Sequence, residues 1–122
     1  MLVPFVLKSS PIFHGEKQTF GPKGAYAVYS EGDVGQGDAK ALADYLIAAG
    51  YFSGDAEQAV QVSKKDGIYT LSIPIAREHW NDEDVVYHLD QLKIDMAQSV
   101  LQGKVKIIVV AVVSNKVVSK EF

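Results

Sequence analysis

Apolar and polar residues follow two different periods along this chain, and the changes between them mark the predicted elements. Apolar residues at every second position predict strands over 58–63 and 68–75, and the aromatic and β-branched character of 25–30 predicts another. Apolar residues three and four positions apart predict two helices, one from Asp38 to Gly50 and one from Asn81 to Gly103. A nearly continuous β-branched run over 105–113 predicts the central strand of a sheet, and 116–119 predicts a strand that returns beside it.

The residues at the ends of the predicted helices support these bounds. Asp38 and Asn81 are suited to cap helix N-termini, because their short side chains accept hydrogen bonds from free backbone N–H groups. Gly50 suits a helix C-terminus, where glycine adopts left-handed backbone at little cost. The stripes that we expect to be buried are Ala39, Leu42, Ala43, Leu46 and Ala49 in the first helix and Val85, Leu89, Leu92, Met96 and Val100 in the second.

Short turn sequences separate the predicted strands. The dipeptide Asp66-Gly67 between two alternating segments is typical of a two-residue hairpin turn, and Ser114-Asn115 predicts a second hairpin. Residues 14–18 are polar and 20–24 contain glycine and proline, so both segments predict turns that precede the first strand.

The element order predicts the fold class. Strand, helix, two strands, helix and strand is the βαββαβ order of ferredoxin-like folds, so we expect an α+β two-layer sandwich with an extra C-terminal hairpin strand. A single domain over 1–122 is expected, because 122 residues with 48% hydrophobic and 22% charged content suit one core. Within it, 25–120 would form the core and 1–20 an N-terminal arm or the remnant of an anchor.

The first seven residues are apolar and allow more than one interpretation. Met1 to Leu7 would form a short N-terminal strand, a docked arm, or the end of a signal or membrane anchor from a longer protein. The chain has no apolar run near the roughly 20 residues that a membrane-spanning helix needs.

Composition excludes several classes of function. The formal net charge of −3 argues against a protein that binds nucleic acid through phosphate contacts. The chain has no cysteine, which excludes disulfides, thiolate metal sites and cysteine nucleophiles. We therefore predict no catalytic residue, no metal site and no cofactor from motifs alone.

The densest group of polar residues lies at the start of the second predicted helix. His79 with a neighbouring acid would suit acid–base chemistry, and Asp84 and His88, four residues apart on one helix face, would suit two metal ligands. No third ligand is placed by local spacing, and acids in a first helical turn ordinarily complement the helix dipole. Trp80 would form a stacking platform or, as is more usual for a lone tryptophan, a lid on the core.

Other segments suggest contact surfaces. Gly32, Gly35 and Gly37 precede a helix but lack the lysine and serine or threonine of a phosphate-binding loop, so a flexible connection is expected.

The lysines of the C-terminal hairpin suit an acidic partner or lipid headgroups, although edge lysines more often prevent strand aggregation. A βαββαβ layer leaves one sheet face uncovered, and the residues predicted there are Tyr26, Ile68, Thr70 and Ile108.

A set of positions along the chain resembles a known type of domain. Val28-Tyr29, Tyr45-Leu46 and Gly50-Tyr51-Phe52, followed by the hairpin and the acidic second helix, resemble a small uncharacterised bacterial domain found in membrane-anchored proteins. The resemblance covers 25–118, rests on structural positions and carries over no catalytic residue. It implies a soluble domain beside a membrane anchor that lies outside this chain.

The sequence favours a non-enzymatic module that binds a protein partner or a second copy through its sheet. The alternatives are a small metal-dependent or acid–base enzyme with its site at His79, Trp80, Asp84 and His88, and a ligand-sensing regulatory domain. Compartment and ligand are not determined by the sequence.

Overall fold

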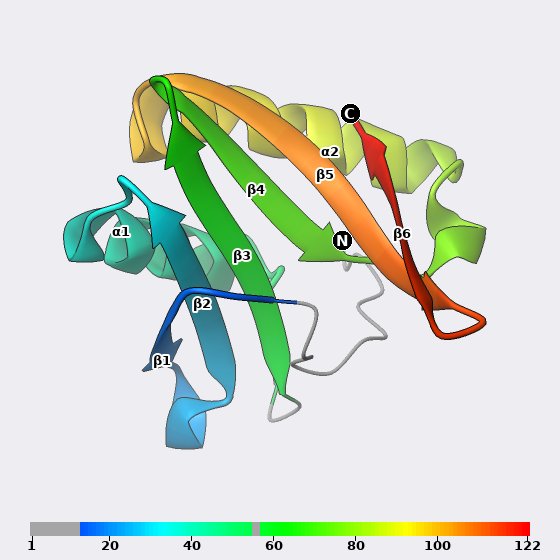
Figure 1. Cartoon of the computed structure of the whole chain (residues 1–122), viewed down its shortest axis with the longest axis horizontal. Helices are drawn as coiled ribbons and strands as arrows, with labels where there is room; N and C mark the ends of the chain where they lie inside the picture. The colour runs from blue at the N-terminus through cyan, green and yellow to red at the C-terminus, as the bar shows by residue number, and fades with distance from the viewer. Residues whose placement is uncertain (1–12, 55–56) are drawn as a thin grey trace.

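The structure is a computed structural model and describes residues 13–54 and 57–122. Within that part of the chain, six strands form one mixed sheet, with two α-helices on one side of it (Figure 1). The strands are β1 (Glu16–Phe20), β2 (Tyr26–Gly32), β3 (Gln58–Lys65), β4 (Ile68–Pro74), β5 (Lys104–Val113) and β6 (Lys116–Glu121). The helices are α1 (Gln36–Ala48) and α2 (Glu83–Asp95), with short 3₁₀ turns at Pro22–Gly24 and Arg77–His79 and a π-helical turn at Met96–Val100.

The strands lie in the sheet in the same order as in the sequence. β2 and β3 are parallel neighbours, as are β4 and β5, and the other neighbouring pairs are antiparallel. Parallel neighbours need a crossover connection, and α1 and α2 supply the two crossovers. The prediction of an α+β domain with one sheet and two helices is therefore confirmed.

The strand order differs from the predicted ferredoxin-like arrangement. A split βαβ unit places another strand between its two parallel strands, whereas here the parallel strands hydrogen-bond directly to each other. The pair β4–β5 runs opposite to β2–β3, yet both helices contact one core on the same face. The two crossovers consequently have opposite hands, and one of them has the rarer left hand.

The core lies between the helices and the sheet. Leu42 and Leu46 of α1 and Leu89 and Leu92 of α2 are fully buried there, as the apolar spacing predicted. The strand residues that meet them alternate along each strand, and in β4 they are Tyr69, Leu71 and Ile73. Burial of whole leucine or isoleucine side chains stabilises a fold by about 1.5–3 kcal/mol each, so this layer accounts for much of the stability.

The two predicted hairpin turns and the predicted end of the first helix at Gly50 are confirmed. Asp66 and Gly67 have φ values of 53° and 78°, as a type I′ hairpin requires, and Ser114 and Asn115 have 50° and 63°. Gly50 has φ of 84° after α1, and the Phe52 N–H donates to the Leu46 carbonyl at 3.0 Å, which closes the helix end.

The bounds of both helices differ from the predictions. α1 begins two residues before Asp38 with Gly35 as its N-cap, and Asp38 lies in its first turn. The N-cap of α2 is Asp82 rather than Asn81. Regular α-helix ends at Asp95, and the π-helical turn then carries the buried Met96 before Gln102 takes a left-handed φ of 54°.

Two strands also differ from the predictions. Residues 16–20, predicted to lie in turns, form the edge strand β1; most of its side chains are exposed, so no apolar alternation marked it. β5 is not central but second from the opposite edge. Its apolar run is continuous because it is buried on both faces over Val109 to Ala111.

The predictions for Met1 to Leu7 lie outside the described residues. The division into an arm over 1–20 and a core over 25–120 stays a prediction.

Candidate functional site

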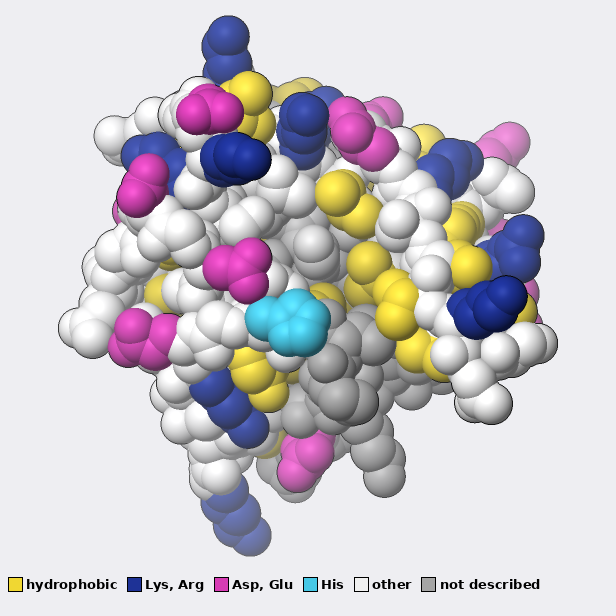
Figure 2. Space-filling view, viewed as in Figure 1, with side chains coloured by type: hydrophobic (Ala, Val, Ile, Leu, Met, Phe, Trp, Pro, Cys, Tyr) yellow, Lys and Arg dark blue, Asp and Glu magenta, His cyan; other side chains and the backbone are white. Residues whose placement is uncertain are grey.

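The face of the sheet opposite α1 and α2 carries the candidate site, and we call it the helix-free face. Its centre is buried, because Phe13 packs there against Ala27, Ala59 and Val110. The rings of Phe13 and Tyr29 lie 5.8 Å apart in a tilted arrangement. Figure 2 shows this face, with apolar side chains gathered over β5 and β6 and lysines or arginines near the end where β4 and β5 begin.

A hollow of about 290 Å³ opens on the helix-free face beside the β3–β4 turn. Its lining residues come from β3, the turn, β4 and β5, and are Lys65, Asp66, Ile68, Thr70 and Lys106. The strand register explains this gathering, since Lys65 pairs with Ile68 and Thr70 pairs with Lys106. Paired residues of neighbouring strands point to the same face.

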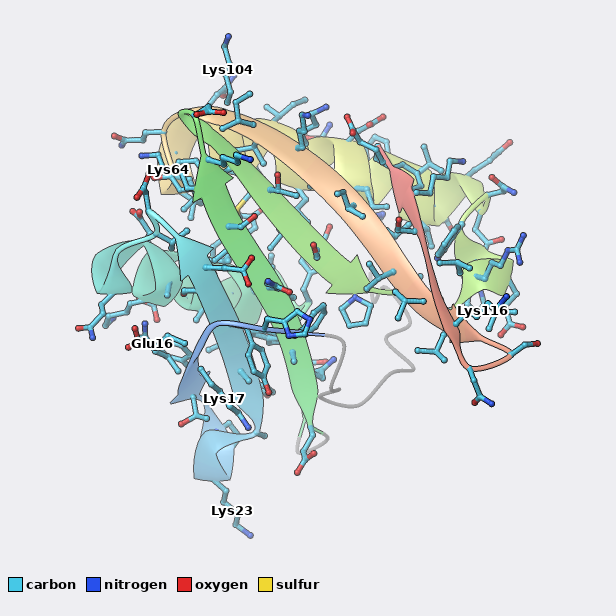
Figure 3. The ribbon with its side chains drawn as sticks, in the orientation of Figure 1. Glu16, Lys17, Lys23, Lys64, Lys104 and Lys116 are labelled. Atoms are coloured by element: carbon cyan, nitrogen blue, oxygen red, sulfur yellow. The ribbon has the colours of Figure 1, made fainter. Side chains whose placement is uncertain are left out.

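The hollow carries more positive than negative charge. Within the described residues, neither Lys65 nor Lys106 takes part in an ion pair or side-chain hydrogen bond, and Asp66 is the one carboxylate in the lining. Lys104 lies two residues before Lys106 at the start of β5 and projects from the end of the sheet (Figure 3). The end of the face near the β3–β4 turn is therefore locally basic on a chain whose net charge is −3.

β6 does not reach the part of β5 that lines the hollow. The pairing of β5 with β6 runs from Ile108 with Glu121 to Val113 with Lys116. Among the described strands, none therefore lies on that side of the first residues of β5, including Lys106.

The structure brings together two of the four residues predicted on the uncovered face. Ile68 and Thr70 line the hollow, and Ile108 lies farther along the same face, partly buried against the Phe13 cluster. The placement of Tyr26 was wrong. Its side chain is 4% exposed in the helix-side core, where its ring stacks on Phe52 at 5.0 Å and its hydroxyl donates to the Gly54 carbonyl at 2.6 Å.

Trp80 belongs to the core rather than to an open site. It is 7% exposed, and its indole Nε1–H donates to the Ile75 carbonyl at 2.8 Å. Burial of the ring together with its one donor satisfies both parts of the side chain. The lid interpretation of Trp80 therefore fits the structure, and a stacking platform does not.

His79 is the member of the predicted cluster with a carboxylate partner. Its Nδ1 lies 2.8 Å from Asp82 Oδ2, and its Nε2 lies 3.9 Å from Glu78 Oε1. The pair lies at the surface, and the hollow is lined by none of these residues. This geometry holds the histidine ring beside the N-terminus of α2.

Asp84 and His88 do not meet through their side chains. His88 Nδ1 lies 2.7 Å from the backbone oxygen of Asp84, and its ring packs edge-on against Tyr87 at 5.4 Å. No group of three or more metal-ligating side chains occurs among residues 13–54 and 57–122. The binding role predicted for His79, Asp84 and His88 stays a prediction, whereas the ring of Trp80 is buried in the core.

Sequence reasoning missed a polar cluster between the two helices. The Tyr45 hydroxyl of α1 donates to Asp95 Oδ2 of α2 at 2.5 Å, and the Tyr51 hydroxyl donates to the His88 carbonyl at 2.9 Å. Burial and the Asp95 carboxylate raise the pKa of Tyr45 far above its usual range and raise the pKa of Tyr51 to about 12. Both tyrosines therefore remain protonated donors. Tyr45 joins α1 to α2, and Tyr51 joins the segment after α1 to α2.

The last strand forms an open edge of the sheet. The Phe122 N–H donates to the Ile107 carbonyl at 2.7 Å, and antiparallel bonds alternate along a strand pair. The backbone groups of Val117, Ser119 and Glu121 consequently point away from β5. Among the described strands none lies on that side.

The side chains of β6 divide between the two faces. Val117 pairs with Val112 on the helix-free face, and these valines are 55% and 43% exposed. Lys116, Val118 and Lys120 alternate with them on the helix side. Lys116 extends from the β5–β6 hairpin (Figure 3), whereas Lys120 donates to Asn81 Oδ1 at 3.2 Å and lies 5.0 Å from the centre of the Phe122 ring.

Comparison with known proteins places this fold in a family. Residues 23–121 match the AF_1994_N model, described as a family N-terminal domain, so the chain belongs to this small uncharacterised family. The match spans β2 to β6 and begins after β1. No curated protein and no solved structure matches the chain. No helix of the described residues is both long and apolar enough to cross a membrane.

Proposed function

We propose that this domain is a non-enzymatic interaction module that binds an extended segment of a partner protein along β6. The observation that carries the proposal is the open edge of β6, with the exposed Val117 on one face and Lys116 and Lys120 on the other. A segment that adds to a sheet edge gains backbone hydrogen bonds, and its alternating side chains supply specificity.

The side chains of β6 define the chemistry of the segment. On the helix-free face, a residue beside Val117 and Val112 would be apolar, because it would cover two exposed valines. On the helix side, residues beside Lys116 and Lys120 would be acidic. The favoured partner is therefore an extended segment in which apolar and acidic residues alternate.

Charge argues against a second copy of the domain as the occupant. Each β6 carries two lysines and one glutamate, so two β6 strands side by side would bring together net positive charge. The edge lysines can therefore have two effects, because they disfavour pairing of one β6 with another and attract an acidic partner. We expect a monomer in solution when the partner is absent.

The test uses two labelled hexapeptides, one of alternating valine and glutamate and one of alternating valine and lysine. Fluorescence anisotropy should show binding of the acidic peptide and much weaker binding of the basic one. Ser119→Pro removes an outward N–H without removing a bond to β5, so it should weaken binding. Lys23→Met removes a lysine far from β6 (Figure 3) and should leave binding unchanged.

Equal binding of the two peptides, or full binding by Ser119→Pro, would refute the proposal. The membrane association implied by the sequence resemblance stays a prediction, which fractionation of the natural full-length protein would test.

A further inference from the structure

We infer that the hollow beside the β3–β4 turn is a second binding site, selective for the oxyanion group of a small organic molecule. This inference goes beyond the proposed function and does not depend on it, because the lining comes from β3, the turn, β4 and β5 and includes no residue of β6. The shared chemistry is a carboxylate or phosphate group with a short apolar portion.

Two lysines make the hollow suited to an anion. Lys65 and Lys106 face the same hollow from different strands, and neither is neutralised by a partner within the described residues. Lysine carries three donors and a compact charge, which suits an oxyanion. Two lysines against the single carboxylate of Asp66 favour an anion over a cation.

The remaining lining fits an organic ligand better than an inorganic ion alone. Thr70 offers a hydroxyl that can donate to an oxygen, and Ile68 offers an apolar wall. The volume of about 290 Å³ lies near the lower end of small-molecule pockets, roughly 300–1,000 Å³. A ligand with one charged end and a few carbon atoms would contact both kinds of wall.

The position of the hollow is fixed by rigid structure. The two-residue turn at Asp66 and Gly67 holds Lys65 beside Ile68, and the parallel pairing of β4 with β5 sets Thr70 beside Lys106. The side chains on the opposite side of these strands, among them Tyr69 and Ile107, are buried in the main core. The backbone of the site is therefore preorganised, and only the lysine side chains need to be ordered on binding.

The experiment is a titration of the ¹⁵N-labelled protein with inorganic phosphate and, separately, with succinate, at constant ionic strength set by sodium chloride. We expect saturable shifts of the backbone amides of Ile68, Thr70 and Lys106. Saturable shifts with phosphate alone would indicate a ligand that carries a phosphate group. Saturable shifts with succinate alone would indicate a ligand that carries a carboxylate. Saturation by both would support the shared oxyanion chemistry.

Three variants should change the affinity for the anion in directions that the charges of the hollow predict. Lys65→Met and Lys106→Met should each weaken the affinity about fivefold, as expected when one charge at the site is removed in a solvated setting. Asp66→Asn should strengthen it by a similar factor, because it removes the competing carboxylate while asparagine tolerates the left-handed backbone. Lys23→Met, in the exposed turn between β1 and β2, is the matched control and should change nothing.

Circular dichroism should show that all four variants fold, since the altered side chains are exposed. The inference is overturned if neither anion gives saturable shifts in the wild-type protein, if Lys23→Met weakens binding as much as Lys106→Met, or if Asp66→Asn weakens it.

Discussion

Truncation of Trp80 provides a quantitative test of its structural role. The side chain is 7% exposed and its indole N–H donates to the Ile75 carbonyl at 2.8 Å. Replacement of a buried tryptophan by alanine costs about 3–5 kcal/mol, because it removes apolar burial and leaves a cavity. Trp80→Phe keeps most of the ring and loses the hydrogen bond, so we expect a loss of about 1–2 kcal/mol.

The measurement is urea unfolding followed by far-ultraviolet circular dichroism. Fluorescence cannot serve for these variants, because Trp80 is the only tryptophan of the chain. A domain of this size has a total stability of about 5–15 kcal/mol, so a Trp80→Ala protein would keep only part of it. The midpoint should fall while the slope of free energy against urea stays nearly constant.

His79→Ala is the matched control beside it in the chain. His79 lies 2.8 Å from Asp82, but both side chains are partly exposed, at 35% and 51%. A solvated pair of this kind contributes about 0–1 kcal/mol. If Trp80→Ala cost less than His79→Ala, the placement of Trp80 in the core would be wrong.

Three further predictions concern other parts of the molecule. Because the pKa of Tyr51 is raised to about 12, the stability contributed by its protonated hydroxyl is present below pH 10 and is lost as the pH rises through 12. Urea unfolding at several pH values should show this loss of stability, and Tyr51→Phe should make the loss smaller. Addition of zinc should leave the melting temperature and the His79 and His88 ring resonances unchanged, whereas a saturable shift of both histidines would contradict the structural account of this cluster. Gly67→Ala should lower the free energy of unfolding by about 1 kcal/mol, because only its φ of 78° opposes a side chain there. Gly37→Ala inside α1 should raise the free energy of unfolding by about 0.5–1 kcal/mol, because alanine favours the helix. Urea midpoints that move in the opposite directions would refute these expectations.

The parts of the fold that could be predicted depend on neighbours in the sequence. The Asp66-Gly67 hairpin needs only two residues with left-handed backbone, and both have it. The leucines of α1 and α2 were predicted to be buried because helical spacing places them on one stripe, as at Leu42 and Leu46. Local geometry was sufficient for both features.

The strand order could not be predicted in the same way, because it depends on contacts between distant segments. The usual right-handed crossovers favoured the interleaved ferredoxin-like order, and this chain instead combines a sequential order with crossovers of opposite hand. The edge strand β1 escaped prediction for another reason. Its residues are largely exposed on both faces, so they show no apolar period.

The candidate site was predicted in part. Ile68 and Thr70 were placed correctly by the period of β4, but Lys65 and Lys106 join them only through the pairing of three strands. Tyr26 was misplaced because an aromatic residue in a strand suits either face, and its contact with Phe52 decides which one.

Recognition of an extended acidic segment by β6 can be measured by amide shift mapping with the alternating valine–glutamate hexapeptide. We expect the largest shifts at the outward-pointing amides of Val117, Ser119 and Glu121, and Ser119→Pro should greatly reduce the shifts at the other two. Shifts confined to the hollow at Lys65 and Lys106, or no saturable shift along β6, would contradict this recognition.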